Sequence, residues 1–316
     1  MRARIRWSNV VLSLALALAP AAAAPWLARW HWLVDLAANF VVQVTGTLLL
    51  ATMALAAARR WRAMALVGAA AGLGLAAALP PFLASPNPGP ADGPTVRVLS
   101  LNLLRENDGN VAQALAAVRA FAPDVVFCSE VTPAWQRGLD AGLVDFPHRI
   151  ARADGGWFGV ALYAKLPLHD AAVLPLGYAW APCIRATVAT PHGPLGVLGI
   201  HTPRPGSALR NEERDRALAA VPDLVKALGP HVLVLGDCNA TTWTPAFQDL
   251  LTRTGLRAAG DGRFAPTWPA HVPLPLRIRI DHALLGQGLG VVDFAVGEPF
   301  GSDHLPLFVE LRLPRT

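Results

Sequence analysis

Near the N-terminus the apolar positions form three long runs, and beyond them they recur in short segments. The runs extend from about Ser8 to Ala24, from about Leu33 to Ala57 and from about Met64 to Leu83. Each is close to the roughly 20 apolar residues with which an α-helix crosses a bilayer. The pattern predicts a membrane anchor over residues 1–84 with three transmembrane helices, the second of which spans with some tilt.

Arginine residues flank these runs unevenly. One cluster precedes the first run and another separates the second from the third, while Arg29 alone lies in the remaining loop; the clusters are Arg2, Arg4, Arg6 and Arg59, Arg60, Arg62. Positively charged segments that flank transmembrane helices tend to stay in the cytoplasm. We therefore expect a multi-pass protein of the cell (inner) membrane whose later residues lie on the extracytoplasmic or periplasmic side. A cleaved signal peptide is an alternative for the first run, and it would leave two spans.

Residues 85–94 are rich in Pro and Gly and predict a linker. Beyond it, residues 95–316 alternate between short apolar runs, typical of strands, and segments with helical spacing. We expect helices over 110–121, after His201 and over 246–254, with Pro222 kinking or splitting the second of these. The expected strands occupy 96–103, 125–130, 156–165, 183–190, 194–202, 232–235, 278–285 and 304–313.

Charge divides the chain at the linker. Residues 1–94 hold seven Arg against two Asp, a net charge of +5, and residues 95–316 hold equal numbers of basic and acidic residues. Proteins that bind duplex DNA non-specifically present a basic face, which the balanced composition of the C-terminal domain does not predict.

Polar residues close the strand-like runs. The run 232–235 leads through Gly236 to Asp237 and Asn239, whose side chains point the same way on extended backbone, with Cys238 turned into the core. Other runs end likewise, at Asn102, Glu130, His201, Asp281 and the segment Ser302, Asp303, His304. Ends of core strands converge on one rim of a layered α/β domain. We therefore expect one shared site, although each residue alone also suits a cap or a turn.

This set of residue types suits a divalent cation and a water-activating base. Glu130 closes an apolar run, where a carboxylate is costly unless it is paired or bound to a metal. With Asn102 and Asp303 as further candidate ligands, it forms a thiol-free shell that suits Mg²⁺ or Mn²⁺, then Ca²⁺, better than Zn²⁺. His304 is the candidate general base, and either Asp281 or Asp303 orients its imidazole.

The remaining polar residues suit a phosphoryl group. We expect Asp237 and Asn239 to hold the attacking water and a non-bridging oxygen, and His201 to donate to the phosphoryl group. A cation, hydrogen-bond donors and a base that activates water together favour a phosphate ester as the substrate.

Six segments resemble, in order, motifs of the endonuclease/exonuclease/phosphatase superfamily, which has the deoxyribonuclease I-like fold. They are LSLNLL with Asn102, PDVVFCSEV with Glu130, HTPRP with His201, GDCNATTW with Asp237 and Asn239, IDHALL with Asp281, and GSDHLPL with Asp303 and His304. The resemblance covers roughly 95–314 and is strongest to a bacterial membrane-anchored branch, in which segments like PTWPA (266–270) recur. It implies two packed, mostly antiparallel β-sheets flanked by helices, a four-layer α/β/β/α sandwich, with a metal-binding Glu130 and a His304 supported by Asp281.

The resemblance does not select a substrate, because this fold hosts several activities on one centre. We expect a membrane-embedded, metal-dependent hydrolase of a phosphodiester or phosphomonoester in a lipid, nucleotide or nucleic acid. The alternatives are an extracytoplasmic endo- or exonuclease, and a catalytically silent tethered module that binds phosphate headgroups or a partner. For Trp157, Phe158 and Trp180 we expect core packing rather than a pocket.

Overall fold

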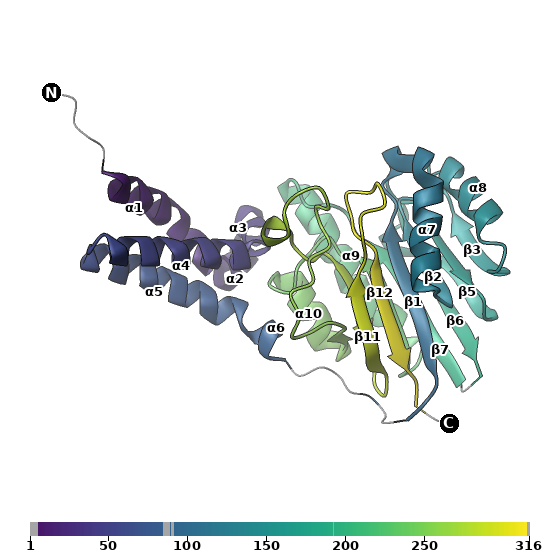
Figure 1. Ribbon diagram of the computed structural model, residues 1–316. Helices are drawn as coiled ribbons and strands as arrows, with labels where there is room; N and C mark the ends of the chain where they lie inside the picture. The colour runs from purple at the N-terminus through teal and green to yellow at the C-terminus, as the bar shows by residue number, and fades with distance from the viewer. Residues whose placement is uncertain (1–5, 85–88, 90–91, 192, 315–316) are drawn as a thin grey trace. The chain divides into compact units, whose positions relative to one another are not determined.

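The computed structural model describes residues 6–84, 89, 92–191 and 193–314 (Figure 1). The chain divides into two compact units. The first comprises Met1–Ala84 with Thr242–Gln248, and the second comprises Ser85–Thr241 with Asp249–Thr316.

The N-terminal unit is helical. Its main helices are α1 (Trp7–Leu18), α3 (Trp32–Ala38), α4 (Val41–Ala57) and α5 (Trp61–Ala78), with short turns α2 (Ala24–Leu27) and α6 (Pro80–Leu83). Two helical segments, Trp7–Trp30 and Trp61–Ala78, are long and apolar enough to cross a membrane, and the bent pair α3 and α4 would make a third. Two or three apolar helices near the N-terminus could therefore cross a membrane.

The second apolar run is not one straight helix. Its two helices, α3 and α4, meet at an angle of 69°. The break falls at Asn39, whose Nδ2 donates to the carbonyl oxygens of Asp35 at 3.1 Å and Leu36 at 3.3 Å. These bonds satisfy carbonyls that the last turn of α3 would otherwise leave open, so the local polar side chain ends the helix inside an apolar run.

The C-terminal unit contains two six-stranded mixed sheets. The first has the order β11 (Gly290–Val296), β12 (Leu307–Arg312), β1 (Thr95–Asn102), β2 (Val125–Ser129), β4 (Val160–Ala164), β3 (His148–Arg152). The second has the order β5 (Leu168–Tyr178), β6 (Ala181–Thr190), β7 (Gly193–His201), β8 (Val232–Asp237), β10 (Asp281–Leu285), β9 (Arg257–Ala258). Among the strand pairs of the described residues, β1–β2 and β7–β8 are parallel and the others are antiparallel.

The two sheets pack face to face through one apolar core. Phe127 of β2, fully buried, fills the space opposite Gly199 of β7 and Gly236 of β8, where an added Cβ would meet its ring. On the outer face of the first sheet, α7 (Val111–Phe121) and α8 (Pro133–Gly142) contribute Val118, Trp135 and Leu139 to a second apolar cluster. Helix α9 (Ala208–Lys226) packs against β5 of the second sheet, and α10 (Pro245–Thr254) follows β8 (Figure 1).

The layered fold expected from the sequence is confirmed, with three corrections. First, α9 runs through Pro222 without a break, because Leu218, Val221 and Val225 are buried beside the proline and hold the helix in place. Second, Asp281 and His304 do not end strands: Asp281 begins β10 and His304 precedes β12. Third, the apolar pattern of the sequence does not predict β3, β5, β9, β11 or α8. Much of β5 and β11 is exposed, so their apolar alternation is weak.

Candidate active site

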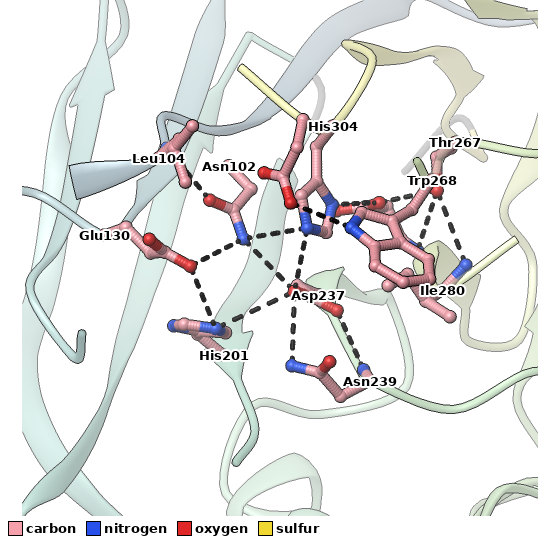
Figure 2. A network of polar contacts seen from close by, with 12 residues as sticks. Asn102, Leu104, Glu130, His201, Asp237, Asn239, Thr267, Trp268, Ile280 and His304 are labelled. Carbon is pink, nitrogen blue, oxygen red and sulfur yellow. Dashed lines mark hydrogen bonds and ion pairs between the residues drawn. The ribbon is translucent and has the colours of Figure 1, made fainter. Parts of the chain in front are cut away.

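The polar residues singled out in the sequence lie together at one end of the two sheets (Figure 2). Because β10 and β12 run antiparallel to β8 and β1, their first residues reach the rim that the last residues of β1, β7 and β8 occupy. The group is buried apart from Asp303, which is half-buried; its members are Asn102, Glu130, His201, Asp237, Asn239, Asp281, Asp303 and His304.

Asp237 and Asn239 face each other through a turn rather than along extended backbone. Asn239 has a left-handed φ of 44°, and its backbone N–H donates to Asp237 Oδ1 at 2.8 Å. Its Nδ2 donates to Asp237 Oδ2 at 3.3 Å and to the carbonyl of Thr202 at 2.9 Å. The expected juxtaposition is present, but the expected extended backbone is wrong.

Asn102 lies at the centre of the group. Its Nδ2 lies 3.3 Å from Glu130 Oε1, 3.1 Å from Asp237 Oδ2 and 3.4 Å from His304 Nε2. Its Oδ1 accepts the backbone N–H of Leu104 at 3.2 Å. In this arrangement Asn102 is a hydrogen-bond donor to the carboxylates, and ligation through Oδ1 requires the amide to rotate.

His304 is held by Asp281 rather than by its neighbour Asp303. His304 Nδ1 lies 2.8 Å from Asp281 Oδ2, and Thr267 Oγ1 donates to the same oxygen at 2.5 Å. Asp303 Oδ2 instead accepts the indole N–H of Trp268 at 2.9 Å. The arrangement leaves His304 Nε2 directed at the cluster, 3.6 Å from Asp237 Oδ2.

His201 completes the cluster from β7. Its Nε2 lies 3.7 Å from Asp237 Oδ2 and 3.9 Å from Glu130 Oε1. Burial and, to a lesser extent, the nearby His304 lower the pKa of His201 to about 4. At neutral pH His201 is therefore uncharged and offers a single ring N–H.

Three of the six described non-glycine residues with a left-handed φ lie at or next to this rim. Leu104, Glu130 and Asn239 have φ values of 56°, 59° and 44°, a region that costs a non-glycine residue of order 1–3 kcal/mol. Glu130 is nevertheless fixed, since its Oε2 accepts the backbone N–H of Arg105 at 3.1 Å. Such strain persists only where the surroundings over-determine the conformation, and it is typical of functional sites.

The carboxylates and the imidazole shift one another's protonation. Burial raises the pKa of Glu130, and it raises the pKa of Asp237 to about 8. Burial would lower the pKa of His304, but Asp281 and Asp237 outweigh it and raise that pKa to about 10. Burial would raise the pKa of Asp281, but the charge and hydrogen bond of His304 outweigh it and lower it.

Residues 99–304 match the model of a family described as the endonuclease/exonuclease/phosphatase family. The chain belongs to the endonuclease/exonuclease/phosphatase family. The members of this family are hydrolases that act on phosphoester bonds, and they use divalent metals. None of the curated proteins matches the chain.

Solved structures share the fold of this family member. The endonuclease/exonuclease/phosphatase from Beutenbergia cavernae is 23% identical, with a TM-score of 0.55 over 69% of this chain and 72% of that one. The family protein from Bacteroides thetaiotaomicron is 16% identical, with a TM-score of 0.59, and the match covers 71% of this chain and 99% of that one. D. rerio TDP2 complexed with a single-strand DNA product is 17% identical, with a TM-score of 0.56, and the match covers 69% of this chain and 99% of that one.

The carboxylates of this family member fit a divalent cation. Burial raises the pKa of Glu130 and of Asp237 by more than the nearby His304 lowers it, so the surroundings compensate the ionised carboxylates only in part and a cation would stabilise them. Among the described residues, Asp237, Asp281 and His304 form one group whose ligand atoms lie within 4.8 Å of one another. Asp281 Oδ2 is held by Thr267 and His304, whereas Glu130 Oε1 and Asp237 Oδ2 both face the amide of Asn102. A cation at that point would be reached by Glu130 and Asp237.

Three residues that support the site were given no role from the sequence. Thr267 and Trp268 hold Asp281 and Asp303. Ser302 Oγ donates to the carbonyl of Asn102 at 2.7 Å and accepts the backbone N–H of His304 at 3.0 Å. The segment PTWPA, which contains Thr267 and Trp268, was the signal available in the sequence.

Proposed function

We propose that the chain is a membrane-anchored, divalent-metal-dependent phosphoesterase that hydrolyses a phosphodiester or phosphomonoester with water activated by His304. The observation that carries this proposal is the position of the imidazole. Its Nδ1 is bound to Asp281 at 2.8 Å, and its Nε2 faces Asp237 at 3.6 Å. An imidazole that is oriented on one side and open to a polar cluster on the other is suited to take a proton from water.

Each neighbour of His304 has a proposed role. Asp237 and Asn239, held side by side by their mutual hydrogen bonds, hold the attacking water and a non-bridging oxygen. The buried, neutral His201 donates its N–H to the phosphoryl group. Asp281 holds Nδ1 of the imidazole, so that the neutral form of His304 carries its proton on Nδ1 and its lone pair on Nε2.

Glu130 is the principal proposed metal ligand, with Asn102 and Asp303 as further candidates. The donor set is oxygen-rich and fits Mg²⁺ or Mn²⁺, then Ca²⁺. When bound, the cation would neutralise charge on the phosphoryl oxygens and oppose the carboxylates that raise the pKa of His304.

The membrane-anchored part of the proposal rests on the N-terminal helices. Two or three of them are apolar enough to span, and the arginine clusters flank them asymmetrically. By the positive-inside rule the C-terminal unit belongs on the extracytoplasmic side of the cell membrane. Protease protection in intact and opened cells tests this topology.

An assay of the full chain in detergent tests the activity. The substrates are bis-p-nitrophenyl phosphate, plasmid DNA and phospholipid vesicles, each with Mg²⁺ and with EDTA. The proposal predicts Mg²⁺-dependent turnover that EDTA abolishes. Cleavage of the plasmid alone would favour a nuclease, and no turnover of any substrate would favour a silent binding module.

A further inference from the structure

A row of aromatic rings leads away from His201. The ring centroid of Phe158 lies 5.5 Å from that of His201, and it lies 4.8 Å from that of Trp180 in an edge-to-face contact. Trp180 in turn stacks on Tyr178, with centroids 5.1 Å apart and planes inclined by 27°. We call Phe158, Trp180 and Tyr178 the aromatic row.

The aromatic row is not part of the core. Trp180 is 36% exposed and the adjacent Trp157 is 48% exposed, so the expectation of core packing is wrong for both. Phe158 comes from the loop between β3 and β4 of the first sheet, whereas Trp180 lies in the turn between β5 and β6 of the second. Side chains from the loops of two different sheets therefore meet on a surface next to the polar cluster that contains His201.

Guanidinium groups of α9 lie over the outer rings of the row. Arg210 lies 6.0 Å from the ring centroid of Trp180, and Arg216 lies 5.0 Å from that of Tyr178. The side chains of both arginines are more than half exposed, and they also form ion pairs, Arg210 with Glu213 at 3.1 Å and Arg216 with Glu212 at 3.4 Å. The row thus combines partly exposed aromatic rings with guanidinium groups.

This combination favours a planar, anionic ligand. Ring-on-ring and guanidinium-on-ring contacts are the pairings with which proteins hold nucleobases. Trp and Arg also suit a membrane surface, but the row is continuous with His201, which makes a group of the substrate itself the better occupant. The zero net charge of residues 95–316 disfavours a long polyanion.

Building on the proposed function, we propose that the aromatic row is a subsite that stacks the base of a small nucleotide-type phosphate ester while its phosphorus lies at the His201 end. Stacking of one base on an aromatic side chain contributes about 1–3 kcal/mol, which is roughly a 5- to 150-fold change in affinity. Trp180, edge-to-face with Phe158 and stacked on Tyr178, is the residue whose loss should weaken the subsite most.

Kinetics of the full chain in detergent with Mg²⁺ test the proposal. Two diesters share a p-nitrophenyl leaving group: thymidine 5′-(p-nitrophenyl phosphate) and methyl p-nitrophenyl phosphate. We expect Trp180→Leu to raise KM for the thymidine ester about tenfold and to change KM for the methyl ester by less than about twofold. We expect Trp180→Phe to retain most of the difference in KM between the two esters, because the ring is kept. Val292→Ala, at an exposed position of β11, is the surface control. Equal effects of Trp180→Leu on both diesters would overturn the proposal.

A binding measurement separates this proposal from the proposed activity. Calorimetry compares 5′-deoxyadenosine 5′-phosphonate, which has no ester bond to hydrolyse, with methylphosphonate. We expect the nucleoside phosphonate to bind at least about tenfold more tightly, and Trp180→Leu to remove that difference. This result would support the subsite even if neither diester were hydrolysed. Equal affinities for the two phosphonates would refute the subsite. It would also be refuted if Trp180→Leu lost binding to phosphatidylglycerol vesicles but bound both phosphonates as the unchanged chain does.

Discussion

His304 Nδ1 and Asp281 Oδ2 lie 2.8 Å apart, although 23 positions separate the two residues in the chain and the strands next to them belong to different sheets. Asp281 begins β10 of the second sheet, and His304 precedes β12 of the first. The pair is buried and receives a further hydrogen bond from Thr267. It therefore depends on the packing of one sheet against the other, and it sets the direction of the imidazole on which the proposed chemistry depends.

Replacement of His304 by Ala should lower kcat by at least ~10² while KM changes little, because a general base acts in the transition state rather than in substrate binding. Steady-state kinetics with bis-p-nitrophenyl phosphate measure this. His169→Ala, at an exposed position of β5, is the matched control. Unchanged turnover in His304→Ala would remove the role of His304 as the base.

Asp281→Asn should reduce kcat by ~10² or more, and Asp303→Asn should reduce it less. Asn at position 281 can donate to Nδ1 and so favour the wrong imidazole tautomer, whereas Asp303 is bonded to Trp268 and not to His304. Paired kinetics of the two variants decide the matter. A larger loss in Asp303→Asn than in Asp281→Asn would contradict the assignment.

Glu130→Gln should increase the Mg²⁺ concentration needed for half-maximal activity by about tenfold or more, because the amide has lost the charge that binds a hard cation. A metal titration of activity measures this shift. The matched control is Glu106→Gln, in which the replaced carboxylate is about half exposed and pairs with Arg105 at 3.2 Å. A titration midpoint that stays the same in Glu130→Gln would argue against Glu130 as a ligand.

Acid should destabilise the C-terminal unit partly through His282. Burial and, to a lesser extent, the nearby Arg279 lower the pKa of this imidazole from its usual 6.5 to about 3. As pH falls from 6.5 towards 3, the unfolded chain binds a proton that the folded chain does not, so stability decreases by about 1.4 kcal/mol per pH unit from this group. Denaturant unfolding at several pH values should show that the free energy of unfolding falls less steeply with decreasing pH in His282→Asn than in the unchanged chain. Identical pH profiles would contradict the prediction.

Gly199→Ala should destabilise the sheet sandwich by about 1–3 kcal/mol, since the new methyl group would meet the ring of the fully buried Phe127. The unfolding temperature should fall by a few degrees per kcal/mol in a unit of this size. Gly206→Ala is the control, because nothing lies within 4 Å of a Cβ built there. Equal melting temperatures for the two variants would show that the sheets can separate slightly at this point.

The sequence alone determined the order of most core elements, the family, and the residue types that gather at the rim. It could do so because buried strands such as β1, β2 and β8 contain long apolar runs. Each run also leads into a polar residue, and burial of a polar residue costs free energy unless it is paired or bound to a ligand. The exposed strands β5 and β11 lack that signal.

Only the tertiary structure decided which groups contact each other. It selected Asp281 over Asp303 as the partner of His304, and it placed Asn239 in a left-handed turn. It also joined Phe158 and Trp180 from different sheets into an aromatic row. These contacts depend on strand direction and sheet packing, which are long-range properties, whereas a sequence pattern reports only the local balance between burial and exposure.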